Sequence, residues 1–260
     1  MRVFQVDSFT DELFQGNPAG VCMFVENESD RWMQNMAREM NLSETAFLKE
    51  AKDGYGLRWF TPTTEVDLCG HATLAAAHTL WESRELDAAN EAQFFTKSGI
   101  LTAAKVGEWI QLDFPLEEDA PVRPPKELVD GLKVPFTYVG KNRMDYLVEV
   151  ESEEILRHLK PNKDMLCKLA NRGVIVTCKA EESKFDFVSR FFAPALGIDE
   201  DPVTGSAHCC LGPYWKRRLR KDEFVAYQAS ERGGILRLRV QDRVYISGQA
   251  RTVFSGAVQF

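Results

Sequence analysis

The amino-acid sequence contains an internal repeat whose period is about half of the chain. Residues 65–101 align with residues 200–236 without a gap, at a constant shift of 135 residues. The matched positions include Gly70 with Gly205, and Gln93 with Gln228. This period is far longer than the roughly 20–50 residues of a solenoid unit. The repeat therefore predicts two similar domains related by a pseudo-twofold axis, with equivalent loops facing each other.

A shorter match upstream helps to define the domains. Residues 58–62 (Arg-Trp-Phe-Thr-Pro) resemble residues 190–194 (Arg-Phe-Phe-Ala-Pro) at a shift of 132 residues. Residues 115–126 are rich in proline and acidic side chains, which is typical of a linker. We therefore expect an N-terminal domain over residues 1–118 and a C-terminal domain over residues 119–260. The last strand is the segment that could return to the N-terminal domain.

The composition indicates a globular protein and narrows the range of partners. With 44% hydrophobic and 27% charged residues, the chain is not expected to contain long disordered segments. Its formal net charge of -7 argues against nucleic acid or an anionic membrane as a partner. The first residues read as a strand rather than a signal peptide, and no apolar run approaches the roughly 18–20 residues of a membrane span. We therefore expect a cytoplasmic location, with the six cysteines as free thiols.

Each half of the chain contains one segment that reads as a wholly buried helix. Residues 72–81 are good helix formers and apolar on nearly every face, and a similar segment follows Ala207. The other segments of both halves read mostly as strands. Because such a helix cannot face water, the strands must enclose it. The sequence thus predicts an α+β protein with two pseudo-symmetric domains, each a curved sheet or barrel around a buried central helix.

A glycine-containing loop directly precedes each of these helices. Gly70 and Gly205 would let a ligand approach the first-turn amides, which have no partner within the helix and lie at the positive end of its dipole. Two such helix starts could bind carboxylates through their backbone amides, without the help of an arginine. The alternative is that the glycines only permit tight turns into the helices. The recurrence of the loop at one shift favours the binding interpretation.

Three titratable residues accompany these loops. Glu44 lies at the edge of an apolar segment, His71 follows the first glycine, and Asp201 directly precedes the second loop. A carboxyl group beside apolar side chains has a raised pKa, and histidine titrates near neutrality, so all three suit acid/base chemistry. Each also has a structural alternative. Glu44 could cap a turn, Asp201 could cap the following helix, and His71 could be a loop histidine with satisfied hydrogen bonds.

A series of motifs, in order along the chain, resembles a known family. These motifs are residues 7–9 (Asp-Ser-Phe) with 16–19 (Gly-Asn-Pro-Ala), 41–47 (Asn-Leu-Ser-Glu-Thr-Ala-Phe), 60–62 (Phe-Thr-Pro), 68–73 (Leu-Cys-Gly-His-Ala-Thr) and 201–207 (Asp-Pro-Val-Thr-Gly-Ser-Ala). In this combination the chain resembles the phenazine biosynthesis PhzF-like family over essentially its whole length. That family is similar in fold to diaminopimelate epimerase, with two pseudo-symmetric halves, each a sheet or barrel around a central helix, and the site between them.

The resemblance implies a cofactor-free isomerase of a dihydro-hydroxyanthranilate, in which a glutamate moves a proton between ring carbons. By this resemblance Glu44 is the general acid/base, and His71 and Asp201 orient the substrate and tune that acid. The groups that resemble the family's carboxylate-binding backbone and hydroxyl are Gly70, Gly205 and Ser206. The expected substrate is a small carboxylate-bearing molecule, such as a cyclic hydroxy-amino acid, bound between the two domains. The family also implies a homodimer.

The cysteines leave other functions open. Epimerases of the related fold use two facing thiols, one in each loop. Here the first loop keeps Cys69, whereas Thr204 takes the corresponding place in the second, and a hydroxyl is far too weak an acid to replace a thiol. A two-thiol mechanism is therefore disfavoured, but a thiol-dependent epimerase and a non-catalytic metabolite- or protein-binding member remain alternatives. The cysteines and histidines lack the paired spacing of metal ligands, so the sequence predicts no metal site. It also contains no glycine-rich nucleotide-binding motif.

Overall fold

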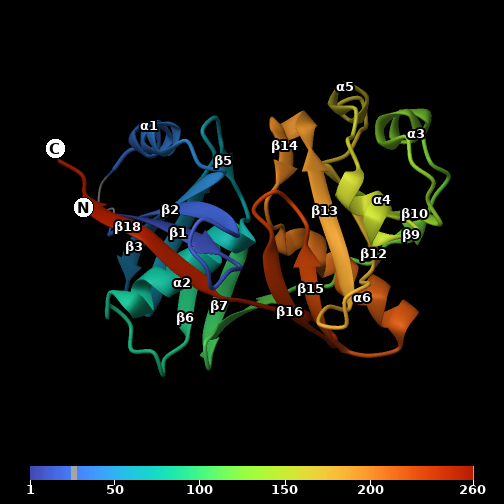
Figure 1. Cartoon of the computed structure of the whole chain (residues 1–260). Helices are drawn as coiled ribbons and strands as arrows, with labels where there is room; N and C mark the ends of the chain where they lie inside the picture. Colours follow the sequence, from blue (N-terminus) through green and yellow to red (C-terminus); the bar gives the residue numbers. More distant parts are fainter. Residues whose placement is uncertain (25–27, 260) are drawn as a thin grey trace. The chain divides into compact units, whose positions relative to one another are not determined.

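The computed structural model describes residues 1–24 and 28–259, and the chain forms two compact units (Figure 1). Unit 1 comprises Met1–Asp113 and Tyr245–Phe260, and unit 2 comprises Phe114–Val244. The sequence predicts a division between residues 118 and 119 and leaves open a return of the last strand to the N-terminal domain. In the structure, residues 114–118 instead belong to unit 2, and residues 245–260 belong to unit 1. The return to unit 1 has a physical cause, because the last strand forms hydrogen bonds with the first.

Unit 1 is a sheet of mixed direction. Its strands are β1 (Arg2–Ser8), β2 (Asn17–Met23), β3 (Glu44–Ala51), β4 (Gly54–Phe60), β5 (Glu65–Val66), β6 (Ala92–Thr96), β7 (Gly99–Val106), β8 (Trp109–Phe114), β17 (Val244–Gly248) and β18 (Ala250–Ala257). β18 pairs with β1, and β1 pairs with β2. The order then runs β2, β3, β4, β6, β7 and β8, and β8 pairs with β17. The β2–β3 and β4–β6 pairs are parallel, and the other pairs of this series with a described register are antiparallel.

Helix α2 (Gly70–Glu82) forms the centre of unit 1. Ten of its 13 residues are buried, and the alanines at positions 75–77 have no exposed surface. Figure 1 shows α2 among the strands of its unit, and it contacts β1, β2, β3, β7 and β18. The small side chains allow strands to approach the helix from several sides. The second helix, α1 (Asp30–Met40), packs on β3 and β4, and the Ser29 side chain caps its start by accepting a hydrogen bond from the Trp32 amide.

Unit 2 repeats this plan with additional short helices. Its strands are β9 (Ala120–Pro121), β10 (Tyr138–Lys141), β11 (Asp145–Glu149), β12 (Gly173–Lys179), β13 (Phe187–Ala193), β14 (Ile198–Asp201), β15 (Glu223–Gln228) and β16 (Gly234–Val240). Its helices are α3 (Lys126–Leu132), α4 (Glu153–His158), α5 (Lys163–Leu166), the 3-10 helix η1 (Pro194–Leu196) and α6 (Gly205–Leu219). Helix α6 is the buried one. Its Trp215 stacks on Phe187 of β13 at 5.5 Å between ring centroids. None of the described helices is long and apolar enough to cross a membrane.

The strand pairing of the two units matches element by element. In unit 1 the parallel pairs are β2–β3 and β4–β6, and in unit 2 they are β11–β12 and β13–β15. Antiparallel pairs β3–β4 and β12–β13 lie between them in the same order. The equivalent buried helices α2 and α6 begin at the two glycines that the 135-residue shift aligns. The structure thus confirms the predicted fold class, in which each unit is a sheet around a buried helix.

The proline-rich segment 115–126 is more ordered than a linker. Pro121 lies in β9, which pairs with Gly140 of β10, a location that suits a residue without an amide donor. The Asp119 side chain is buried, accepts a hydrogen bond from the Tyr138 hydroxyl at 2.5 Å and pairs with Arg217. The acidic residues of this segment are therefore partly structural, since they tie the start of unit 2 to its sheet and to α6.

Candidate active site

In unit 1 the start of strand β3 meets the first turn of helix α2. Glu44 is the first residue of β3 and lies opposite Ala19 of the parallel strand β2. His71 is the second residue of α2. The Glu44 Oε2 and His71 Nε2 atoms are 3.4 Å apart, and the two side chains are only 13% and 6% exposed. The fold therefore brings together two of the predicted site residues from separate segments of the chain.

The His71 imidazole is neutral near pH 7. Burial lowers the pKa of this histidine to about 3. Its contact with Glu44 is therefore one between a carboxyl group and an uncharged ring, not an ion pair. The 3.4 Å separation exceeds the usual N–H···O range of about 2.7–3.2 Å. Hydrogen bonds of catalytic groups are often this long before a substrate binds, so the distance is compatible with a catalytic pair.

Cys69, His71 and Glu44 form a compact cluster, in which the imidazole contacts both a thiol and a carboxyl group. The Cys69 Sγ lies 3.5 Å from His71 Nδ1, while Nε2 faces Glu44. A neutral imidazole has one donor and one acceptor nitrogen. The tautomer with its proton on Nε2 can donate toward Glu44 and accept from the Cys69 thiol. The cluster therefore has the composition of a proton-transfer chain.

The same three side chains could also hold a metal ion. One ligand atom from each of Glu44, Cys69 and His71 lies within 4.8 Å of the other two. Carboxylate, thiolate and imidazole are all zinc ligands. However, the thiol and the carboxyl group face different ring nitrogens. A metal ion shared by all three residues would bind only one nitrogen of the ring, so one of the two observed contacts would have to break.

In unit 2 the loop before α6 is held by buried polar contacts. Asp201, 8% exposed, is the last residue of β14 and accepts a hydrogen bond of 2.5 Å from the Thr204 hydroxyl. Gln228 accepts from the Thr204 amide at 2.9 Å and donates to the Asp201 carbonyl at 2.8 Å. Gly205 and Ser206 then begin α6. The contact with Thr204 is a structural task for Asp201, and it leaves the predicted catalytic role untested.

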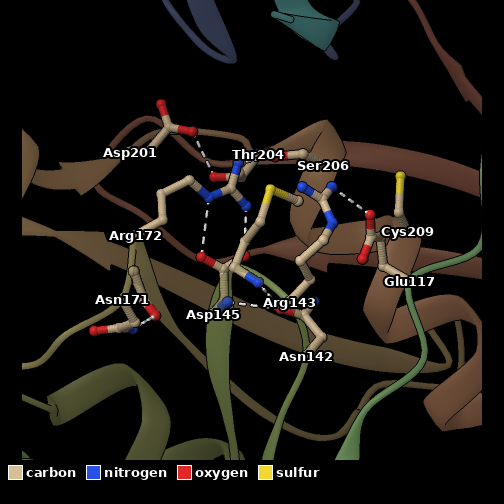
Figure 2. A network of polar contacts seen from close by, with 12 residues as sticks. Glu117, Asn142, Arg143, Asp145, Asn171, Arg172, Asp201, Thr204, Ser206 and Cys209 are labelled. Carbon is tan, nitrogen blue, oxygen red and sulfur yellow. Dashed lines mark hydrogen bonds and ion pairs between the residues drawn. The ribbon is translucent and has the colours of Figure 1, made fainter.

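Sequence reasoning missed an arginine beside this loop. Figure 2 shows Arg172 at the start of α6, where its Nη1 donates to the Ser206 Oγ at 2.8 Å. The guanidinium also donates from Nε to the Asp145 Oδ1 at 2.9 Å and from Nη2 to Oδ2 of the same carboxylate. An arginine therefore lies beside this helix start, which was not predicted from the sequence. Burial lowers and the bonds to Asp145 raise the pKa of Arg172, with a net upward shift, so the group stays charged.

No motif surrounds Arg172 in the sequence, which explains why it was overlooked. It stands in Asn171-Arg172-Gly173, and these residues read as a turn. One signal was present. Residues 174–178 read as a strand in the second half and residues 45–48 in the first, and a charged residue lies just before each, Arg172 two positions before and Glu44 directly before. The repeat was too faint at these positions to align the two.

The other thiols and the histidine of α6 belong to the core of unit 2. Cys209 and Cys210 are buried, and burial raises the pKa of the Cys209 thiol to about 12. His208 is fully buried, its Nδ1 lies 2.8 Å from the Thr204 carbonyl, and burial lowers its pKa to about 4. These environments favour packing over thiolate or imidazolium chemistry.

Comparisons with known proteins identify the family. A family profile described as "Phenazine biosynthesis-like protein" matches residues 6–256. The chain belongs to this PhzF family. It is 58% identical to an uncharacterized isomerase of Halalkalibacterium halodurans, over 96% of each chain. The crystal structure of a PhzF family protein from Enterococcus faecalis superposes with a TM-score of 0.93 at 41% identity, covering 100% of this chain and 99% of the other.

A more distant solved structure is similar in fold alone. A probable proline racemase from Agrobacterium radiobacter has a TM-score of 0.66 at 11% identity, over 99% of this chain and 92% of the other. This confirms the expected relation to the racemase and epimerase fold. The roles that the PhzF resemblance implies for Glu44, His71, Asp201 and the residues at the two helix starts remain predictions.

Proposed function

We propose that this PhzF family member is an isomerase that transfers a proton between carbons of a small carboxylate-bearing substrate, with Glu44 as general acid/base and without a cofactor. The observation that carries the proposal is the contact of Glu44 with His71 in a largely buried setting at the start of α2. The relative from Halalkalibacterium halodurans is named an uncharacterized isomerase, which supports this reaction class.

The proposed reaction needs one group that accepts and then returns a proton. The Glu44 carboxylate would take a proton from one carbon, and the electron pair left behind would delocalise into the unsaturated substrate. Glu44, now a carboxylic acid, would return the proton to a different carbon and regain its charge, so that no atom is gained or lost. His71, neutral and adjacent, would hold the Glu44 carboxyl group in one orientation.

The substrate class follows from the donors at the two helix starts. The first-turn amides of α2 and α6, at Gly70 and Gly205, suit a carboxylate or a developing enolate, and the Ser206 hydroxyl adds a further donor. We propose that the start of each buried helix is a binding site for such a group in its own unit, as the repeat leads us to expect. The family resemblance suggests a cyclic hydroxy-amino acid. A homodimer and a cytoplasmic location also remain predictions from the sequence.

One contact favours a second candidate function. The Cys69 Sγ lies 3.5 Å from His71 Nδ1, so the imidazole could accept the thiol proton and leave a thiolate base. Such a base would suit a thiol-dependent epimerase. Against it stands the pKa of His71, which burial lowers to about 3 and which makes the imidazole a weak proton acceptor. Thr204, which takes the place of a second thiol in the repeat, also argues against it.

Deuterium uptake from heavy water tests these functions. Wild type would be incubated with a panel of small acids, including dihydro-hydroxyanthranilate, other cyclic hydroxy-amino acids and common amino acids, and uptake read by mass spectrometry. We expect Glu44→Gln to lower uptake at least roughly 100-fold, the typical contribution of a positioned acid or base. Glu50→Gln is the matched control, because Glu50 is an exposed carboxylate on the same strand.

The variants separate the candidate functions. Uptake lost in Glu44→Gln but kept in Cys69→Ala would support the proposed isomerase. Loss in Cys69→Ala, with Glu44→Gln still active, would overturn it in favour of the thiol-dependent epimerase. No uptake by wild type with any acid that it binds would also overturn it, and would indicate a binding protein.

A further inference from the structure

We infer that Arg172 binds the anionic group of the substrate, so that unit 2 carries a subsite for carboxylates built from a guanidinium, the Ser206 hydroxyl and the start of α6. The identity of the ligand as a small carboxylate rests on the proposed function. The inference goes further in assigning the binding of that carboxylate to a side chain outside the repeated loops.

The strand register places Arg172 one residue before the counterpart of Glu44. Thr45 lies opposite Phe60 in unit 1, and Val174 lies opposite Phe192 in unit 2. Phe60 and Phe192 are equivalent in the repeat, so the residue before Thr45, which is Glu44, corresponds to Gly173. Gly173 has no side chain, and the charged residue stands one position earlier, at Arg172.

The helix partners of these charged residues are equivalent as well. His71 corresponds to Ser206 at the 135-residue shift. In unit 1 the strand start places a carboxyl group beside position 71, and in unit 2 it places a guanidinium beside position 206. The two copies therefore present opposite charges at the same place. One copy is equipped for proton transfer and the other for binding an anion.

The guanidinium is held in a fixed orientation. Asp145, which has no exposed surface, accepts from both Nε and Nη2, and the guanidinium carbon lies 5.3 Å from the centre of the Phe191 ring. Nη1 is thereby directed to Ser206 (Figure 2). A guanidinium has five N–H donors. Among the described contacts, Nη1 and Nη2 each keep one N–H that is not used, and the Arg172 side chain is 27% exposed.

A second arginine of unit 2 shows what a purely structural arrangement looks like. Arg190 also binds a carboxylate through Nε and Nη2, that of Glu200, at 2.7 Å in both bonds. Its Nη1, however, donates to the backbone carbonyls of Leu156 and Leu159, and its side chain is only 11% exposed. Nη1 of Arg190 thus binds backbone carbonyls at the end of helix α4, whereas Nη1 of Arg172 binds the Ser206 hydroxyl of the candidate site.

The acidic neighbours of Arg172 define how it would bind an anion. Asp145 balances the guanidinium charge and Asp201 is a second nearby carboxylate, so the attraction for an anion would come mainly from directed N–H bonds and from the amides at the start of α6. Such bonds demand planar carboxylate geometry, which a lysine cannot match. The subsite should therefore discriminate strongly between a carboxylate and a neutral amide of the same shape.

Paired ligands test this subsite in the full-length protein. Anthranilate and anthranilamide differ in replacing a carboxylate by a neutral amide, and their dissociation constants would be measured by calorimetry. We expect wild type to prefer anthranilate by at least about tenfold, the effect of one charge-assisted hydrogen bond. Arg172→Gln and Arg172→Lys should both reduce this preference to about twofold or less. Arg190→Gln, the matched control, should keep the preference although it loses an ion pair.

The outcomes separate this inference from the proposed function. A preference retained in Arg172→Gln and Arg172→Lys, with both variants folded by circular dichroism, would overturn the subsite, as would a wild type that does not prefer anthranilate. If Arg172→Gln does not fold, the preference of Arg172→Lys for anthranilate over anthranilamide alone tests the subsite. The protein could also show no deuterium uptake and yet prefer anthranilate in a way that depends on Arg172. That result would support the subsite and contradict only the proposed isomerase activity.

Discussion

At the scale of single residues, the chain keeps two imidazoles uncharged at the first turns of its buried helices. His71 and His208 are 5% and 0% exposed. Burial lowers their pKa values to about 3 and about 4, because a charged ring would lose its hydration without gaining a strong partner. In the proposed mechanism this keeps His71 from competing with Glu44 as the acid.

These pKa shifts predict a loss of stability in mild acid. The unfolded chain takes up a proton on each histidine below about pH 6.5, whereas the folded chain does so only near pH 3 to 4. The free energy of unfolding should therefore fall as pH decreases, by about 2 kcal/mol for each histidine between pH 7 and pH 5. Urea denaturation at these pH values measures the effect.

The variant His208→Asn provides the comparison. It removes one of the two titrations, so its free energy of unfolding should depend less steeply on pH than that of wild type, even if the variant is less stable throughout. Equal pH dependence in both proteins would show that His208 is protonated in the folded state, contrary to its buried environment.

At the scale of elements, the start of β12 is tightly packed. A side chain at Gly173 would place its Cβ 2.3 Å from the Phe191 ring, which is itself 4% exposed. The same ring lies below the Arg172 guanidinium. The absence of a side chain at Gly173 therefore lets the strand, the ring and the arginine pack together, at the position that Glu44 fills in unit 1.

We expect Gly173→Ala to destabilise the protein by about 1–3 kcal/mol, since the added methyl group forces the Phe191 ring to move. Gly256→Ala is the matched control in strand β18, where an added Cβ meets no atom within 4 Å. Its free energy of unfolding should stay within about 0.5 kcal/mol of wild type. Equal stability of the two variants, measured by urea denaturation, would mean that the ring shifts without cost.

At the scale of the whole molecule, unit 1 is assembled from both ends of the chain. Strand β18 pairs with β1 along its length and packs on the buried helix α2. The first half of the sequence therefore lacks two strands of its own unit, β17 and β18. Without β18, β1 would keep an unpaired edge, and part of α2 would face water.

Removal of residues 250–260 should consequently destabilise unit 1 by at least about 3 kcal/mol, because several backbone hydrogen bonds and an apolar contact surface are lost together. Chemical denaturation followed by circular dichroism would report a lower midpoint or an additional early transition. A chain that ends at Val258 keeps all of β18 and should unfold like wild type. A truncated chain with the wild-type midpoint would show that β18 contributes little to the unit.

The sequence predicted the buried helices well because their signal is local. Residues 72–81 are apolar on all faces, and the structure buries α2 on all sides. The sequence predicted the local structure less well where several distant segments interact. The linker expected at residues 115–126 contains β9 and a buried Asp119, because the pairing of this segment with β10 and Arg217 depends on distant residues.

By itself, the sequence determined the repeat, the two buried helices and the residue types at their starts, because composition and periodicity are properties of contiguous segments. Motifs in combination also identified the family. Only the tertiary structure decided that Glu44 lies against His71, and that Arg172 lies against Ser206. Each of these contacts joins a strand start to a helix start that lies 27 or 34 residues away, and such contacts are set by strand register, which no local pattern encodes.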